Sequence, residues 1–331
     1  MKNPGTLLTI LDRSETDHRL LMKAASLARQ FNARLELFLC DAEHAYALKH
    51  EYQLSQSGEA RHAEARDACV RDALAYLTQI QGTVDLCGLH TVQDAACESP
   101  LYEGIVHKVS QSGPGLVIKG ACAETGGVFD SNDWQLMRKC PATLMMTRGR
   151  IWHTRPRIAA LVDISAAETA GMAQSILDSA EALRAAHGGE LDLVFVQPAT
   201  FDQRSRRGRE AELQELARTS HAHAARVHVL QGDPEALLPA FIREHDYDVL
   251  TLGALTHRDT VTPLVGSLTS RLVESVDCDF ILVRPPRIQH GATVMSRSPS
   301  IRRRTARESA PILATDQAAR NDFNSANNSS A

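Results

Sequence analysis

Short apolar runs alternate with longer amphipathic stretches along this chain, and the whole alternation occurs twice. Residues 6–41 and residues 157–197 each begin with a short apolar run that leads to an aspartate, with a serine two residues later. Each then continues into a stretch with helical spacing of apolar residues and ends on an alternating, strand-like run. A period of roughly 140 residues is too long for a solenoid repeat, which spans about 20–50 residues. We therefore interpret the pattern as a duplicated domain.

The first repeat predicts strands and helices in alternation. Residues 6–11 form a nearly continuous apolar run, which is typical of a strand covered on both faces. Thr16 or Asp17 can cap the helix that follows, whose apolar stripe ends at Phe31. The other predicted strands are 35–39, 83–89, 115–120 and 142–147. The other predicted helices are 59–80, 101–111 and 134–139. In the helix at 59–80 we expect Ala68, Leu74 and Leu77 to face inward.

The second repeat predicts the same order of elements. Its strands are expected at 158–162, 191–196, 226–230, 249–253 and 280–283, and its helices near 168–186, 209–219, 234–245 and 266–276. Strands that alternate with helices of this length form βαβ units, in which a parallel sheet is buried between two helix layers. The sequence thus predicts two tandem α/β domains, each with a doubly wound, five-stranded parallel sheet, and ligands would bind at the carboxyl ends of the strands.

Composition shifts mark the expected boundaries. We expect domain 1 at 1–148, a linker at 149–156, domain 2 at 157–286 and a disordered tail at 287–331, where Ser, Asn, Arg and Pro dominate and periodicity vanishes. The tail carries seven arginines and three acids, and Arg302, Arg303 and Arg304 form its basic cluster. A solvated tail and a nucleic-acid or anionic-surface contact are both open, and we favour the former.

The net charge, the cysteine spacing and the length of the apolar runs bear on the compartment of the protein and on the partners that it binds. The net charge of −4 gives no general case for nucleic-acid binding. The start of the chain has no signal-peptide pattern, and no apolar run approaches the roughly 18 residues that a membrane span needs. Seven cysteines without C-x-x-C spacing favour reduced thiols in a cytoplasmic protein and no zinc site. His221, His223 and His228 are clustered, and we expect them to be exposed loop residues and not a metal site.

The glycines after the fourth strand of the second repeat are candidates for phosphate binding. Gly253, Thr256 and the Gly266-Ser267 pair are separated by two and by nine residues. A glycine at a strand end lets a phosphate approach the backbone, and the start of the next helix offers free N–H groups, with Ser267 and Thr269 as hydroxyl donors. The alternative, which we favour, is that Gly253 and Gly266 only serve the turn and the start of the helix.

This loop, the strand-terminal aspartates and the closing strands CPATLMMTR and CDFILVRPP together resemble the universal stress protein family. The residues 134–141 (WQLMRKCP) are similar to the tandem, E-type members. The resemblance covers both repeats and implies a Rossmann-like, adenine-nucleotide α-hydrolase-like fold. It also implies that Asp163 faces the adenosine end of a nucleotide, with Val162 and Val196 at neighbouring strand ends.

Two departures from the family pattern limit nucleotide binding. Thr256 stands where ATP-binding members usually have glycine, and a β-branched side chain resists positive φ and fills space. In the first repeat the helix start carries Asp130, Ser131, Asn132 and Asp133, which can cap the helix and repel a phosphate. We therefore expect a degenerate loop in domain 1, with ATP or AMP binding open in domain 2 alone.

The sequence contains no constellation that predicts catalysis. No G-x-S-x-G elbow or Ser/His/Asp order is present. The resemblance implies a cytoplasmic, non-enzymatic stress-response protein that acts by binding a ligand or partner, the alternative being an ATP-binding protein with slow hydrolysis. It also implies an intramolecular pseudo-dimer of the repeats through 144–147 and 280–283, with a further homodimer left open. We expect no cofactor other than a nucleotide, no bound metal and no membrane contact, and the sequence does not identify a ligand held between the repeats.

Overall fold

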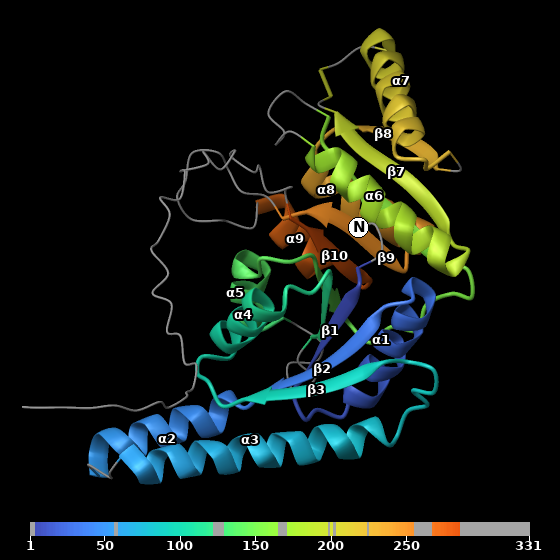
Figure 1. Ribbon diagram of the computed structural model, residues 1–331. Helices are drawn as coiled ribbons and strands as arrows, with labels where there is room; N and C mark the ends of the chain where they lie inside the picture. Colours follow the sequence, from blue (N-terminus) through green and yellow to red (C-terminus); the bar gives the residue numbers. More distant parts are fainter. Residues whose placement is uncertain are drawn as a thin grey trace, which may run out of the picture. The chain divides into compact units, whose positions relative to one another are not determined.

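The computed structural model describes residues 4–55, 59–121, 129–164, 171–197, 199–200, 203–223, 225–254 and 267–284. The strands in this part of the chain are β1 (Thr6–Leu11), β2 (Arg34–Cys40), β3 (Thr91–Ala96), β4 (Leu116–Gly120), β5 (Leu144–Thr147), β6 (Arg157–Leu161), β7 (Glu190–Gln197), β8 (Arg226–Gln231), β9 (Val249–Gly253) and β10 (Asp279–Val283). They join into one sheet with the order β3-β2-β1-β4-β5-β10-β9-β6-β7-β8 (Figure 1). The predicted α/β class with a mostly parallel sheet is confirmed.

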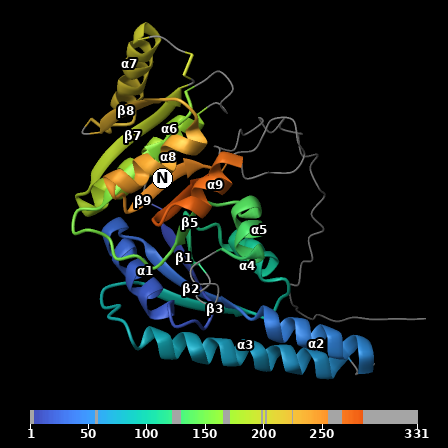
Figure 2. The same cartoon turned by 180° about the vertical axis from the view of Figure 1, so that it is seen from behind.

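Helices connect the strands in both halves. In the described residues they are α1 (Asp17–Phe31), α2 (Ala42–Ser55), α3 (Glu59–Gln81), α4 (Leu101–Ser112), α5 (Ser131–Lys139), α6 (Met172–His187), α7 (Gln203–Thr219), α8 (Pro234–His245) and α9 (Ser267–Ser275). The two halves therefore repeat one β–α order, with the α2–α3 pair of the first half in the place of the shorter α7. Figure 2 shows the same elements from behind.

The two repeats meet at the centre of the sheet. All neighbouring strands are parallel except β5 and β10, which pair antiparallel with Met145 opposite Ile281. These are the two strands at which we expected the contact between repeats. The sheet is thus continuous across both repeats, while the domain boundaries at 148 and 157 remain predictions.

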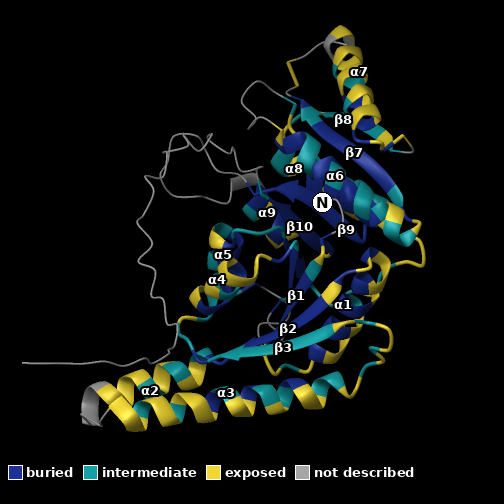
Figure 3. Cartoon of the chain, viewed as in Figure 1, coloured by how far each residue is buried: buried dark blue, intermediate teal, exposed yellow. Residues whose placement is uncertain are grey.

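The sheet is buried on both faces. One core cluster contains side chains of α1, α3, α6 and α7, and the other contains side chains of α4, α5, α8 and α9. Adjacent residues of β1 divide between them, with Leu7 in the first cluster and Leu8 in the second. Figure 3 accordingly shows buried strands between helices whose outer faces are exposed. The run at 6–11 had predicted a strand covered on both sides, and this is confirmed.

The elements of the first repeat differ from the expected pattern in three places. The third strand was expected at 83–89 but lies at Thr91–Ala96. The earlier segment forms turns instead, because the Asp85 carboxylate accepts from the Cys87 N–H and Gly88 has a positive φ of 78°. The helix α2 was not predicted, since its apolar residues lack a clear stripe. On α3 Leu77 is buried, but Ala68 is exposed and Cys69 and Ala73 face inward in its place.

Several sequence predictions lie outside the described residues. They include the disordered tail at 287–331 and most of the loop between Gly253 and Ser267. None of the described helices is both long enough and apolar enough to cross a membrane.

Candidate functional site

Two places in the sheet are suited to ligand binding because the strand order reverses there. In the first half, β2 and β3 lie on one side of β1 while β4 lies on the other, and β6 has the same relation to β7 and β9 in the second half. Ligands of open α/β sheets bind at such points, beyond the carboxyl ends of the strands. Asp12 follows β1 directly and Asp163 lies two residues after β6. Both strand-terminal aspartates therefore lie at a switch point.

In the second repeat, the structure brings Val162, Asp163 and Gly253 to one switch point. The pairing of Ala160 with Thr251 sets the ends of β6 and β9 side by side. Val162 is buried and Asp163 is exposed. Both residues therefore lie at the switch point, while a role of Asp163 in ligand binding remains a prediction.

The other predicted nucleotide-binding residues are only partly described. Val196 is half-buried on β7, next to β6. Ser267 is the first residue of α9, and Thr269 in the same turn is only 3% exposed. Thr256 and Gly266 lie outside the described residues. The phosphate-binding loop therefore remains a prediction.

Close packing favours a glycine at position 253. A Cβ at this position would lie 3.2 Å from both Cγ and Sδ of Met172 and 3.4 Å from Cδ1 of Ile176. A larger residue would therefore require the Met172 side chain to shift by a few tenths of an ångström. This supports the structural interpretation of Gly253, one of the two alternatives that the sequence left open.

In the first repeat, the helix start corresponding to α9 is occupied by the chain's own carboxylates. The Asp130 side chain accepts from the Asp133 N–H at 2.7 Å, and the Asp133 side chain accepts from the Asp130 N–H at 3.2 Å. This capping box satisfies N–H groups that a phosphate would otherwise use. The predicted self-capping of α5 is confirmed.

A buried ion pair lies behind this cap. Nζ of Lys119 lies 2.7 Å from Oδ1 of Asp133, and the two side chains are 4% and 0% exposed. Nζ of Lys119 also donates to the carbonyl of Gly120 at 3.0 Å. The space at the end of β4 therefore holds a cation of the protein itself.

A second polar network lies at the first switch point. The Asp17 carboxylate accepts from the Arg13 N–H at 3.0 Å and from the Tyr76 hydroxyl at 2.8 Å. Burial, and next the nearby Asp12 carboxylate, raise the pKa of Asp17 to about 6. Thr16 precedes α1 but its side chain makes no capping bond, so the proposed cap by Thr16 was wrong.

A cavity of about 710 Å³, hereafter the inter-repeat cavity, lies between α1 and the segment that joins β5 to β6. Leu20, Leu27, Ile151, Trp152 and Pro156 form apolar parts of its wall. Its lining also includes Arg19, Lys23, Arg148, Arg150, His153 and His187, against the single acid Glu15. The wall is thus apolar with an excess of basic groups.

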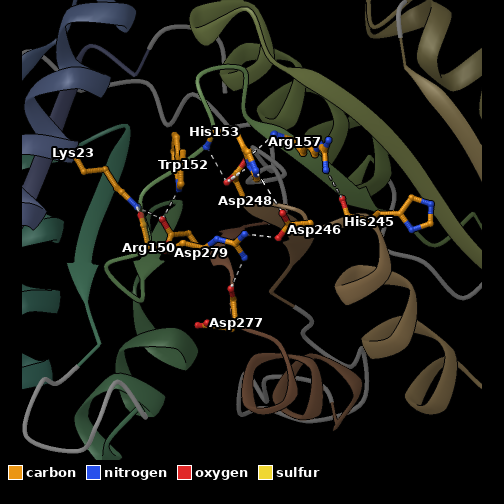
Figure 4. A network of polar contacts seen from close by, with 10 residues as sticks. All are labelled: Lys23, Arg150, Trp152, His153, Arg157, His245, Asp246, Asp248, Asp277 and Asp279. Atoms are coloured by element: carbon orange, nitrogen blue, oxygen red, sulfur yellow. Dashed lines mark hydrogen bonds and ion pairs between the residues drawn. The ribbon is translucent and has the colours of Figure 1, made fainter.

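Asp279 connects the two repeats beside this cavity (Figure 4). This residue is fully buried at the start of β10. Its carboxylate accepts from the Trp152 indole N–H at 2.8 Å, from the Arg148 N–H at 2.9 Å and from the Lys23 ammonium. One carboxylate of the second repeat therefore anchors the linker and α1 of the first repeat.

A neighbouring carboxylate fixes the rest of the linker. Asp248, also fully buried, accepts from the N–H groups of His153 at 3.2 Å and Arg157 at 2.9 Å. The His153 ring lies 3.0 Å from the same carboxylate, and Arg150 is paired with Asp246 (Figure 4). The segment 148–157 is therefore held in place by three acids of the second repeat.

Burial sets the protonation of two basic groups on the cavity wall. It lowers the pKa of Lys23, and the Asp279 carboxylate opposes this effect. It also lowers the pKa of His187, whose ring packs edge-on against Trp152 with centroids 5.6 Å apart. The lowered pKa favours the neutral form of the His187 imidazole, and Lys23 relies on the Asp279 carboxylate to keep its positive charge.

Sequence reasoning missed Lys23, Trp152 and Asp279. A usable signal was present, because Asp279 directly precedes the apolar run Phe280–Val283 and a lone acid in a buried strand needs a partner. The expectation for His228 was also wrong. It lies on β8, where Nε2 is 3.1 Å from the buried Asp192 carboxylate, whereas His221 and His223 are exposed.

Comparison with known proteins supplies the family. Residues 165–284 match the universal stress protein family. A universal stress protein E from Photorhabdus laumondii is 22% identical over 307 residues, which cover 86% of this chain and 96% of that protein. The second repeat thus matches the universal stress protein family, and most of the chain is similar to universal stress proteins E. A universal stress protein E from Escherichia coli K12, 19% identical over 304 residues, likewise covers 86% of this chain and 95% of its own length.

Solved structures share the fold of this universal stress protein. A functionally unknown protein from Pseudomonas aeruginosa PAO1 matches with a TM-score of 0.61 and 18% identity, covering 86% of this chain and 94% of its own. A universal stress protein from Archaeoglobus fulgidus matches with a TM-score of 0.58 and 14% identity, covering 85% and 98%. These likenesses show that the fold is shared. The family model and the E-type relatives support a tandem, E-type universal stress protein with a role in the stress response.

Proposed function

We propose that this universal stress protein acts by binding a small molecule in the inter-repeat cavity, without catalysing a reaction. The volume of about 710 Å³ carries this proposal, because small-molecule sites are commonly clefts of about 300–1,000 Å³ with apolar walls and a few polar groups. The apolar wall favours a ligand with an apolar body, and the guanidinium groups of Arg19 and Arg148 in the lining favour an anionic group on it.

The polar groups of the cavity are engaged in ways that suit binding more than catalysis. The His153 ring is held by Asp248, and the His187 ring lies 3.3 Å from the Leu183 carbonyl. Lys23 bonds to Asp279, to Oγ1 of Thr147 and to the Arg150 carbonyl. A general base must reach the proton that it removes, and these groups are directed at the protein instead.

The binding experiment uses the full chain and 1-anilinonaphthalene-8-sulfonate, a fluorescent probe with an apolar body and an anionic group. The chain has two tryptophans, so Trp134→Phe leaves Trp152 as the sole donor for energy transfer to bound dye. We expect saturable transfer. Native mass spectrometry of the untreated protein then shows whether a natural ligand is carried through purification.

A matched pair of variants tests the location. Ser26 is exposed on α1 and lines the cavity, whereas Gln30 is exposed one turn later on the same helix and does not line it. Ser26→Trp should fill the opening and abolish dye binding, and Gln30→Trp should leave it unchanged, each read by dye emission. Equal dye binding by the two variants would place the ligand elsewhere.

A second candidate function is adenine-nucleotide binding in the second repeat, with or without slow hydrolysis of bound ATP. The exposed Asp163 at the switch point favours it. Calorimetric titration with ATP and AMP should then show one site per chain, and Gly266→Asp should remove it while the fold is kept. Binding unchanged in that variant would mean that the site is wrongly assigned.

We further propose that the β5–β10 pairing replaces the contact that joins two chains in single-domain members, and that any homodimer uses another surface. The antiparallel register of Met145 and Ile281 supports this, because the pairing covers two apolar edges that would otherwise invite aggregation. We also propose a cytoplasmic location, supported by the free thiols of Cys40, Cys69, Cys87, Cys97, Cys140 and Cys278. Sizing of the purified chain tests the homodimer.

A further inference from the structure

A separate group of metal-ligating side chains lies where β2 and β3 end, outside the inter-repeat cavity. Among the described residues, Asp41, His44 and Cys69 form a group whose ligand atoms all lie within 4.8 Å of one another. They come from the end of a strand and from two different helices. The sequence had favoured no metal site because these residues are spread along the chain and lack C-x-x-C spacing.

Local structure brings the first two ligands together. Asp41 follows β2 directly, and its Oδ1 accepts from the His44 N–H at 3.1 Å, which caps the start of α2. Nδ1 of His44 lies 2.9 Å from Oδ2 of Asp41. The imidazole is 67% exposed and the carboxylate is 9% exposed. One ligand is therefore fixed by the fold, and the other can rotate onto a cation.

The sheet and α3 supply two thiols. Cys69 is buried on α3, and its Sγ lies within 4.8 Å of the ligand atoms of Asp41 and His44. Cys97 follows β3, and the pairing of Cys40 with Ala96 sets Asp41 and Cys97 side by side at the strand ends. Cys97 is 4% exposed. The corner thus contains one carboxylate, one imidazole and two thiols.

We propose that Asp41, His44 and Cys69 form a site for a divalent cation of the zinc type, with a water molecule as the fourth ligand and Cys97 beside it. Zinc takes four ligands in a tetrahedron and uses Cys sulfur, His nitrogen and carboxylate oxygen. Thiolates favour zinc over magnesium and calcium, which prefer oxygen ligands. The site would fasten α2 and α3 to the ends of β2 and β3.

The surroundings allow an ion to enter. Cys97 lines a cavity of about 220 Å³ between α2 and α3, together with Tyr52 and His62. Lys49 and Arg66 also line this cavity, and Arg13 competes for the carboxylate, because its Nη2 is 3.5 Å from Oδ2 of Asp41. The same guanidinium lies 2.7 Å from Asp72, so it keeps a counter-charge when a metal takes Asp41.

The second repeat lacks this set of ligands. Its corresponding strand ends pair Gln197 with Gln231, in the positions of Asp41 and Cys97. Neutral amides are poor zinc ligands. The proposed site would therefore be a property of the first repeat.

Cobalt provides the test, because it replaces zinc and its absorption reports the ligands. The full chain is reduced with a phosphine, stripped with a chelator and titrated with Co²⁺. We expect one Co²⁺ per chain, with near-ultraviolet thiolate absorption and the visible bands of a tetrahedral ion, both removed by Zn²⁺. His44→Ala should weaken binding strongly, Cys69→Ser should also remove thiolate absorption, and Cys87→Ser, at an exposed cysteine outside the cluster, should bind like the parent.

The His44→Ala variant should remain folded, because the side chain that it truncates is exposed, and circular dichroism verifies that it does. A loss of cobalt binding in this variant therefore reports the loss of a ligand and not of the fold. Cobalt binding by His44→Ala and Cys69→Ser with parental affinity and spectrum would overturn the proposal. So would the absence of thiolate absorption in the reduced parent protein. The result does not depend on whether the inter-repeat cavity binds a ligand.

Discussion

Lys119 and Asp133 form an ion pair inside the first repeat at the point where the second repeat has Leu252 and Thr269. The distance between Nζ and Oδ1 is 2.7 Å, and neither side chain is more than 4% exposed. Although burial alone would lower the pKa of Lys119, the Asp133 carboxylate raises it above its usual value. The two repeats thus share a backbone but differ in charge beside the strand end where a phosphate would bind.

Removing one partner of this pair should be costly, and exchanging both should cost less. Lys119→Leu leaves the Asp133 carboxylate buried without its counter-charge, and we expect a loss of about 3–5 kcal/mol in the free energy of unfolding. The double variant Lys119→Leu with Asp133→Thr, which copies the second repeat, should recover part of this loss. Urea unfolding at pH 7 measures both. A single variant as stable as the parent would contradict the pairing.

The free energy of unfolding should depend on the protonation of Asp17 between pH 4 and 7. Its pKa is raised to about 6 in the folded protein from 3.8, so the folded state binds the extra proton. The group therefore stabilises the fold below about pH 4, and this contribution of about 3 kcal/mol is lost as pH rises through 6. Asp17→Asn should remove that loss, so that its free energy of unfolding falls less between pH 4 and 7 than that of the parent.

Asp72→Asn is the matched control, because Asp72 contacts Arg13 nearby but is 66% exposed. It should keep the parental pH profile. A parental profile in Asp17→Asn as well would show that the carboxyl does not titrate in this range. Unfolding by urea at several pH values provides the data.

Much of the fold could be predicted from the sequence, because burial on two faces leaves continuous apolar runs. Most strands lie within one or two residues of their expected positions, as β9 does at 249–253. The third strand was misplaced because Thr91–Ala96 is half-buried along its length and carries little apolar signal. Pattern reasoning is weakest at such edge strands, where packing and not composition sets the register.

The sites were harder to predict than the fold. The capping residues of α5 could be identified because Asp130 and Asp133 act within four positions of each other. The pair Lys23 and Asp279 could not, since 256 positions separate these residues in the chain. The same holds for Asp41 and Cys69, which meet only after α3 has folded back on the sheet. Two residues that are distant in the sequence form no short-range spacing pattern from which their contact could be predicted.

The contact between the repeats should depend on Asp279. Asp279→Asn keeps an oxygen acceptor but leaves the Lys23 ammonium without its counter-charge in a largely buried place, so we expect a loss of about 3 kcal/mol in the free energy of unfolding. Asp277→Asn alters an exposed acid two residues away and should change stability little. Thermal unfolding followed by circular dichroism compares them. Equal midpoints would mean that Asp279 does not anchor the linker.

The continuous sheet should make both repeats unfold together. Ile281 is fully buried on β10, opposite Met145 of the first repeat. Ile281→Ala should cost about 2–5 kcal/mol through the cavity that it leaves. If the sheet is one cooperative unit, a probe in the first repeat must report this loss in full, although the substitution is in the second.

Trp134 on α5 is such a probe once Trp152→Phe has removed the other tryptophan. In that background we expect urea unfolding by fluorescence and by far-ultraviolet circular dichroism to coincide, and Ile281→Ala to shift both midpoints equally. Ile151→Ala, at a side chain that is 87% exposed, should shift neither. An unchanged fluorescence midpoint beside an early loss of circular dichroism would show that the repeats unfold separately. The β5–β10 pairing would then join two independent units, and a ligand in the inter-repeat cavity could act by coupling them.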